Sequence, residues 1–371
     1  MKKLSLYSVS LILSGMLLLV ILYMILTGKI DQAGLLFLLF FGSLAFGFSV
    51  YKSLNSLVFT ITIFAGVAAA LYYPHYFTYI GDFKLTALII PLIQIIMFGM
   101  GTSMSIKDFA GVFKTPRGVF IGVAAQLLIM PLVGFALAKS SNFPPEIAAG
   151  IVLIGCSPSG VASNVMAYLA KANLALSITI TSIATLLAPF LTPLLMKLLA
   201  GEFIEINVLD MMWSITKMII LPIGAGLIFN KLFKTDWLDK AMPLVSMSAI
   251  FLIITIITAA GRDSLLDIGG ILMLLVFIHN LFGYGLGYGF AKLFKMEEQD
   301  ARTIAIEVGM QNGGLASGIA NSLGKIATMG LAPAVFGPLM NITGSILASY
   351  WHKRPPKIVG SVKASIADSQ K

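Results

Sequence analysis

The chain has 371 residues, of which 58% are hydrophobic and only 11% are charged, whereas soluble domains carry about 25% charged residues. These proportions exclude an ordinary water-soluble fold. The net charge of +9 is spread over the segments between apolar runs and is not collected in one basic helix, which excludes the usual form of nucleic-acid-binding surface.

Apolar runs recur along the whole chain. A membrane-spanning helix needs about 20 apolar residues, and twelve runs approach or exceed this length. They are expected at 4–26, 33–51, 54–73, 85–106, 118–138, 146–170, 174–200, 207–230, 243–260, 267–293, 301–324 and 327–351. Outer-membrane barrels would instead show short alternating segments. The sequence therefore predicts an all-α polytopic membrane protein.

Positive charge is distributed unequally between the two sets of loops. Counted from the N-terminus, alternate loops hold 18 of the 25 Lys and Arg residues. Because positive loops stay in the cytoplasm, both termini are expected there, in a multi-pass protein of the inner (plasma) membrane. Residues 352–371 are polar and interrupted by proline, so we expect a disordered cytoplasmic tail.

Two glycine-rich stretches indicate an internal repeat. GCSPSGVAS at 155–163 aligns with GMQNGGLAS at 309–317 at an offset of 154, which places Ser163 over Ser317. The same offset places Glu146 over Asp300 and Lys171 over Lys325. The offset spans five runs, an odd number, so the second copy must cross the bilayer in the opposite sense, as in many secondary transporters. We expect five-helix repeats at 54–200 and 207–351, and an extra N-terminal hairpin at 1–51.

Both glycine-rich stretches lie in the middle of predicted spans. Pro158 removes a backbone donor, and Gly155, Gly160, Gly309 and Gly313 weaken a helix, so both spans are expected to unwind there. Unwound backbone inside a membrane has to be buried or to line a cavity, where freed carbonyls can bind Na⁺. The alternative is an ordinary helix kink.

Polar side chains gather around these breaks. Glu307 is the only acidic residue deep within the apolar runs of the second half. Placing such a carboxylate inside a membrane costs free energy unless it has a partner. It is expected to be an ion ligand, or else to pair with Lys217 or Arg302. Neutral side-chain oxygens lie at the two breaks or on the neighbouring runs, and they belong to Gln126, Ser163, Asn164, Ser177, Thr181, Gln311 and Asn312. One negative charge among neutral oxygens favours a monovalent hard cation over a transition metal.

With these motifs the sequence resembles a bacterial-type member of the bile acid:sodium symporter family. The resemblance rests on GCSPSGVASNVMAYLAKANLALSITITSIATLLAP at 155–189, EVGMQNGGLAS at 307–317, IMFGMG at 96–101 and QLLIMP at 126–131. It implies ten helices in two inverted repeats, with two crossed broken helices in a core domain. Runs three, four, eight and nine would form a panel domain beside it, and the added hairpin would pack outside that panel.

The resemblance also implies two sodium sites that share Glu307. One would use Ser163, Asn164, Ser177, Thr181 and Glu307. The other would use the side chains of Gln126, Glu307 and Gln311 with the carbonyls of Val308 and Met310.

The substrate site is expected between core and panel, near Asn312, Asn341, Val161 and Met340. Here the chain departs from the family pattern. Ser159, Gly160 and Val161 stand where Gly-Gly-Thr is common, and Met340 stands before Asn341 where His is frequent. These residues would make the walls of the substrate cavity more apolar than the family pattern does, which would suit an anion with a hydrophobic body.

The predicted function is sodium-coupled symport of an organic anion, such as a bile acid-like or carboxylate compound, by alternating access. The expected partners are that small solute, two Na⁺ ions and the lipid bilayer, with no nucleic acid. A proton-coupled or uncoupled permease and a non-transport membrane subunit are the alternatives. No nucleophile with a base and no His/Cys cluster is visible in the sequence, so an enzyme is not expected.

Overall fold

The structure is a computed structural model, and it describes residues 6–51, 54–104, 115–233 and 236–356. The tail predicted beyond His352 therefore lies mostly outside the described residues. The first group of helices is α1 (Leu6–Leu26), η1 (Ile30–Gln32), α2 (Gly34–Phe48), α3 (Asn55–Tyr72), α4 (His75–Thr78), η2 (Leu85–Leu88), α5 (Ile89–Ser103), α8 (Pro116–Ser140) and α9 (Pro145–Cys156). The second is α10 (Ala162–Leu169), α11 (Leu174–Leu199), α12 (Val208–Leu232), α13 (Asp236–Ala260), α14 (Arg262–Leu293), α15 (Glu298–Gly309), α16 (Gly313–Ser322) and α17 (Leu331–His352).

Each predicted run corresponds to a helix or to a pair of helices. Among the described residues, eight helices are long and apolar enough by themselves to cross a membrane. The runs predicted to break, at 146–170 and 301–324, form the pairs α9–α10 and α15–α16. The described strands are β1 (Tyr79–Ile80) and β2 (Phe83–Lys84), one short antiparallel hairpin in a loop. The prediction of an all-α polytopic membrane protein is confirmed.

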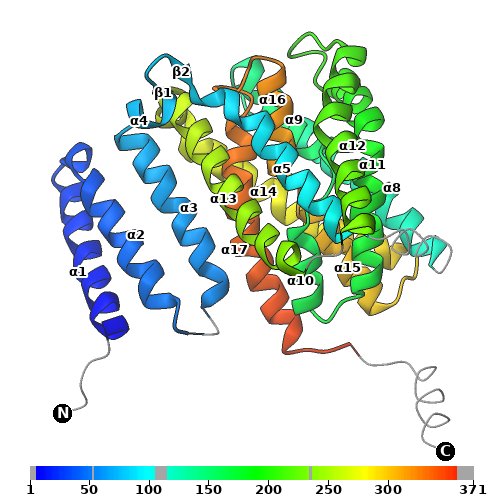
Figure 1. Ribbon diagram of the computed structural model, residues 1–371, viewed down its shortest axis with the longest axis horizontal. Coiled ribbons are helices and arrows are strands. Elements are labelled where there is room, and N and C mark those ends of the chain that lie inside the picture. The colour runs from blue at the N-terminus through cyan, green and yellow to red at the C-terminus, as the bar shows by residue number, and fades with distance from the viewer. Residues whose placement is uncertain (1–5, 52–53, 105–114, 234–235, 357–371) are drawn as a thin grey trace, which may run out of the picture.

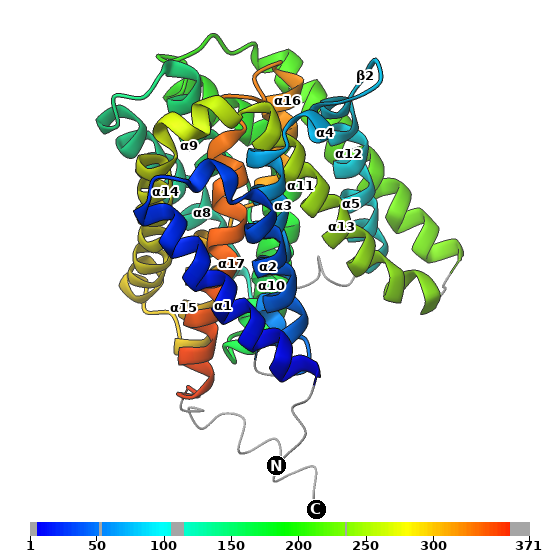
Figure 2. The same cartoon turned by 90° about the vertical axis from the view of Figure 1, so that its left-hand side faces the viewer.

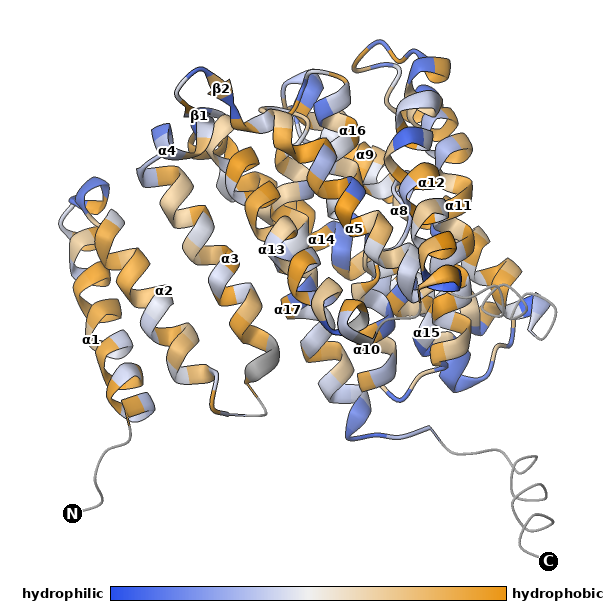
Figure 3. Ribbon diagram, viewed as in Figure 1, coloured by the Kyte–Doolittle hydropathy of each residue, from blue (hydrophilic) through white to orange (hydrophobic). Residues whose placement is uncertain are grey.

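The helices run up and down between two polar edges. The start of α1 and the end of α17 lie at the same lower edge, whereas the β1–β2 hairpin and the loop between α11 and α12 lie at the upper edge (Figure 1). Hydrophobic colouring covers most of the outer helices α1 and α2, and hydrophilic colouring gathers at the loops (Figure 3). This distribution fits a slab of lipid between the two edges.

The helices divide into two packed groups. In one group, α5 packs on α12 and α13, and α13 packs on α3. Gly101 and Gly226 allow the backbones of α5 and α12 to touch, because a Cβ at either position would collide with a backbone oxygen of the other helix. The other group contains α8, α9, α11, α14, α15 and α17. Because α11 also packs on α12, the division into a panel and a core stays a prediction.

Helix bounds repeat at the offset found in the sequence. Adding 154 to the bounds of α9 gives 299–310, against Glu298–Gly309 for α15. α9 descends from the upper edge, whereas α15 rises from the lower edge (Figure 1). An inverted repeat has these properties, although the domain bounds at 54–200 and 207–351 stay a prediction.

Two polar contacts fasten the broken helices to each other, one near each edge. At the start of α9, Glu146 pairs with Lys325 and accepts a hydrogen bond from Thr328 at 2.5 Å; both partners lie in the loop after α16. At the start of α15, Asp300 accepts a hydrogen bond at 2.8 Å from Asn173, in the loop after α10. Thus the first half of each broken helix holds the loop that follows the other broken helix.

The N-terminal hairpin, α1 and α2, packs on the outside of the group that contains α3, α5, α12 and α13. α1 packs on α2, and α2 packs on α3, as Figure 2 shows with the hairpin facing the viewer. Phe37 of α2 lies 5.8 Å from Tyr72 of α3 between ring centroids, and the Tyr72 hydroxyl donates to Ile30 at 2.8 Å. The outer face of α1 is largely exposed and apolar, as expected for a helix in contact with lipid.

Candidate functional site

The two helix breaks meet in the interior of the protein. The Gly160 amide donates to the Met310 carbonyl at 3.3 Å, and the Asn312 amide donates to the Pro158 carbonyl at 2.8 Å. Ser159 and Gln311 form an antiparallel bridge between these bonds. Each break therefore satisfies backbone groups of the other, which membrane-embedded backbone requires.

Glu307 lies beside this bridge, on α15, and is completely buried. Its Oε1 atom accepts hydrogen bonds from Ser163 at 2.7 Å and Ser177 at 2.5 Å. Its Oε2 atom accepts from Ser159 at 2.6 Å and Thr181 at 2.7 Å. The first break, α10 and α11 thus surround one carboxylate with four hydroxyl groups.

Hydroxyl protons are too few for the oxygens in this cage. Ser163 has one hydroxyl proton, but the Gly160 carbonyl and Glu307 Oε1 both lie 2.7 Å from its oxygen. Ser177 lies 2.5 Å from Glu307 Oε1 and 2.8 Å from Asn164 Oδ1. A hydroxyl donates one hydrogen bond, so with Glu307 ionised each of these serine hydroxyls can satisfy only one of the two oxygens that it contacts. A cation among these oxygens would compensate for the excess of acceptors.

A second group of amides lies between α8 and the second break. Gln126 Nε2 donates to Gln311 Oε1 at 2.8 Å and to the Ser157 carbonyl at 3.1 Å. Gln311 Nε2 donates to the Val308 carbonyl at 2.7 Å. Gln126 Oε1 is buried and has no hydrogen-bond partner among the described residues. Such an orphaned acceptor costs about 1–3 kcal/mol unless a ligand binds it.

Comparison with known proteins assigns the family. Residues 90–268 match the sodium bile acid symporter family. The chain is 42% identical over 296 residues to the "uncharacterized sodium-dependent transporter YocS" of Bacillus subtilis, covering 79% of this chain and 90% of that protein. It is 32% identical over 267 residues to the "probable sodium/metabolite cotransporter BASS1, chloroplastic" of Arabidopsis thaliana, covering 71% and 67%. The chain belongs to the sodium bile acid symporter family.

Membership in the sodium bile acid symporter family confirms the resemblance read from the motifs. It makes the chain a multi-pass membrane transporter with a small-molecule substrate, and sodium is the coupling ion that the family name specifies. Both relatives are also named as transporters, in agreement with the expectation that the chain is not an enzyme.

The alternative of a salt bridge to Glu307 is wrong. Arg302 binds Glu298 at 2.8 Å, and its guanidinium lies over the Trp351 ring at 5.5 Å. Lys217 lies over the Trp213 ring at 5.6 Å. Both cations have partners elsewhere, and the hydrogen bonds to Glu307 from the described residues come from hydroxyl groups.

The four residues predicted for the substrate site differ in exposure. Val161 is 46% exposed and Met340 is 7% exposed, so Met340 contributes little surface to a cavity. Asn312 Oδ1 caps α16 by accepting from the Leu315 amide at 3.0 Å, which leaves its amide nitrogen to donate to a ligand. Asn341 is half-buried on α17.

Ser159 is the residue that the sequence prediction of the site missed. The sequence pattern marks Ser159 as a departure from the family and does not place it among the ion ligands, yet its hydroxyl contacts Glu307 as closely as those of Ser163 and Thr181. The available signal was a hydroxyl at a position where this family commonly has glycine.

Proposed function

We propose that the protein is a sodium-coupled symporter that carries an organic anion across the membrane by alternating access. The observation that supports this proposal best is the buried Glu307 carboxylate inside a cage with more acceptors than protons. A hard monovalent cation suits one carboxylate with neutral oxygens. The sodium cotransporter names of the relatives agree with this choice.

Two ions are proposed. The first would bind Glu307 with Ser163, Asn164, Ser177 and Thr181. The second would bind near Gln126 and Gln311, with Glu307 and the carbonyls of Val308 and Met310. The unpartnered Gln126 Oε1 supports the second position, because it is a buried oxygen still available to a ligand.

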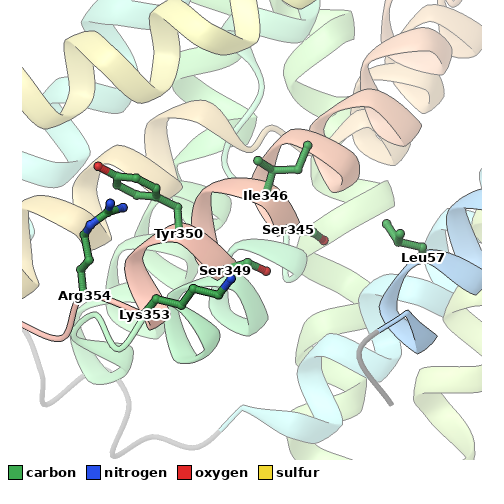
Figure 4. Close-up of a pocket in the computed structure, with 7 residues that line it drawn as sticks. All are labelled: Leu57, Ser345, Ile346, Ser349, Tyr350, Lys353 and Arg354. Atoms are coloured by element: carbon green, nitrogen blue, oxygen red, sulfur yellow. The ribbon is translucent and has the colours of Figure 1, made fainter. Parts of the chain in front are cut away.

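The proposed path of the anion follows α17. Asn341, Ser345 and Ser349 stand four residues apart on α17, and Lys353 follows the end of the helix after four more residues, so they form a polar stripe that winds slowly around the helix. Ser345, Ser349 and Lys353, with Arg354, line a pocket of about 640 Å³ that opens toward Leu57 of α3 (Figure 4). The basic end of the stripe would attract an anion, and Asn341 at its other end could donate hydrogen bonds.

We propose that the lower edge in Figure 1 faces the cytoplasm of a cell with this protein in its inner membrane. The start of α1 and the end of α17 lie at that edge, and alternate loops from the N-terminus carry most Lys and Arg residues. Both termini would then be cytoplasmic.

The coupling ion is tested with purified protein in proteoliposomes. Labelled bile acids, small carboxylates and sulfonates are offered with an inward gradient of Na⁺, with choline in its place, or with a proton gradient alone. Uptake of one of these anions only with Na⁺ is expected. Equal uptake in choline, or uptake driven by protons alone, would overturn sodium coupling.

Asn341 offers a test of the substrate path. Asn341→Ala should weaken anion binding by about tenfold to a hundredfold, because a hydrogen bond to a charged group is lost. Asn341→Asp should weaken it further, since a carboxylate repels an anion. Isothermal titration with the transported anion, in saturating Na⁺, measures both effects. Unchanged affinity in the aspartate variant would contradict this placement.

We also propose that residues 1–51 are a separable addition. Deletion uncovers a face of α3 that carries Phe64 and Tyr72, which lipid can contact, and removal of two helices preserves the orientation of the rest. The truncated protein should retain sodium-driven uptake, measured per folded molecule after size-exclusion chromatography. A monodisperse truncation without any transport would show that the hairpin takes part in the mechanism.

A further inference from the structure

Ser159 is the residue at which the two breaks and the carboxylate come together. Its side chain is completely buried, and its hydroxyl lies 2.6 Å from Glu307 Oε2 and 3.4 Å from Thr181 Oγ1. Ser163 and Ser177 also donate to Glu307, but not every buried serine does so. Ser317, on α16, donates to the Gly313 carbonyl of its own helix at 2.7 Å.

The backbone holds Ser159 in place from both sides. Its bridge to Gln311 lies between the hydrogen bond from Gly160 to Met310 and the bond from Asn312 to Pro158. The position of the hydroxyl therefore depends on both broken helices together. A group fixed in this way binds a ligand without a further loss of conformational freedom.

The hydroxyls divide evenly over the carboxylate. Oε1 accepts hydrogen bonds from Ser163 and Ser177, and Oε2 accepts hydrogen bonds from Ser159 and Thr181. A cation that binds Glu307 has to replace these protons, so each hydroxyl must turn its proton away and present a lone pair. Every hydroxyl has a second acceptor for that proton. For Ser159 this acceptor is Thr181 Oγ1, whereas Ser163 has the Gly160 carbonyl and Ser177 has Asn164 Oδ1.

We propose that the Ser159 hydroxyl is a ligand of the cation that binds at Glu307, and that it contributes to the choice among alkali cations. The inference rests on the proposed sodium site and adds one oxygen to it. Cavity size, ligand number and rigidity decide which hard cation a site prefers. An additional oxygen on a rigid segment raises the number of ligands and fixes one of them in place, and both properties influence which ionic radius fits best.

The test is cation binding by the full-length protein in nanodiscs. The midpoint of thermal unfolding is followed as Na⁺, Li⁺ or K⁺ replaces choline at constant ionic strength, because an ion that binds the folded state raises the midpoint. The variants are Ser159→Ala, Ser163→Ala as an expected ligand loss, and Ser317→Ala as the matched buried-serine control.

Ser159→Ala is expected to weaken Na⁺ binding by about tenfold and to change the ratio of Na⁺ to Li⁺ affinity. Ser317→Ala should bind both ions like the wild type. Ser159→Gly, which keeps the extended backbone, serves if the alanine variant does not fold, and the same loss is expected of it.

Three results would overturn the inference in distinguishable ways. Wild-type affinity in the Ser159 variants, together with a loss in Ser163→Ala, would remove Ser159 from the site and leave the site intact. An equal loss for Na⁺ and Li⁺ would give Ser159 a structural role only. If the wild type shows no ion-dependent shift, the proposed sodium site itself is wrong.

Discussion

Glu307→Gln is expected to reduce sodium-dependent transport to below about 1% of the wild-type rate. Two unit charges about 4 Å apart in a protein attract by roughly 4 kcal/mol, and the variant loses this attraction for every ion that the carboxylate binds. Glutamine keeps the shape of the side chain. Transport is measured in proteoliposomes at Na⁺ concentrations that saturate the wild type.

The same variant should fold normally, since a buried charge without a cation is itself unfavourable. In sodium-free buffer its midpoint of unfolding should equal or exceed that of the wild type, and added Na⁺ should no longer raise it. Glu202→Gln is the control, because Glu202 is a partly exposed carboxylate 3.5 Å from Lys139. A Glu307→Gln protein that Na⁺ still stabilises would refute the assignment.

Much of the fold was accessible from the sequence, because lipid imposes simple rules on it. Helix positions follow from the length of apolar runs. The breaks follow from Pro158, Gly160 and Gly309, whose effect on a helix is local. The side of α11 that carries Ser177 and Thr181 follows from their spacing.

Contacts between distant segments were less accessible. Ser159 and Glu307 are 148 residues apart, and their contact depends on how the two breaks pair. The repeat aligns Glu146 with Asp300 and Lys325 with Lys171, but this alignment does not predict that Glu146 binds Lys325. Such pairs are set by the crossing of the two broken helices, which no local pattern encodes.

The pairing of the breaks also changes the expected chemistry of the carbonyl groups. The sequence predicts that unwound backbone leaves free carbonyl oxygens for ions. In the structure, the carbonyls of Pro158 and Met310 accept hydrogen bonds from the opposite break. A carbonyl oxygen has a second lone pair, so the Met310 carbonyl can still accept a cation, but the proposed site depends more on side chains than the sequence suggested.

Gln126→Ala is expected to separate the two proposed ions. The variant removes the donor to Gln311 Oε1 and the orphaned acceptor Oε1 of Gln126, while the hydroxyl cage of Glu307 remains. The Hill coefficient cannot exceed the number of coupled sites, so the dependence of transport on Na⁺ concentration should fall from a coefficient near two to about one. Initial rates of uptake over a range of Na⁺ concentrations provide the measurement.

Gln94→Ala provides a matched control for this variant. Gln94 lies on α5, and its side chain donates to the Lys217 carbonyl of α12 at 3.2 Å, so its loss should leave the sodium dependence unchanged. Because Gln126 links α8 to both breaks through Gln311 and the Ser157 carbonyl, its loss should weaken the second ion and spare the first. The sodium-induced rise in the unfolding midpoint should therefore persist in Gln126→Ala, in contrast to Glu307→Gln. An unaltered Hill coefficient together with unaltered apparent affinity would place the second ion elsewhere, whereas loss of all sodium stabilisation would mean that the two groups of oxygens form a single site.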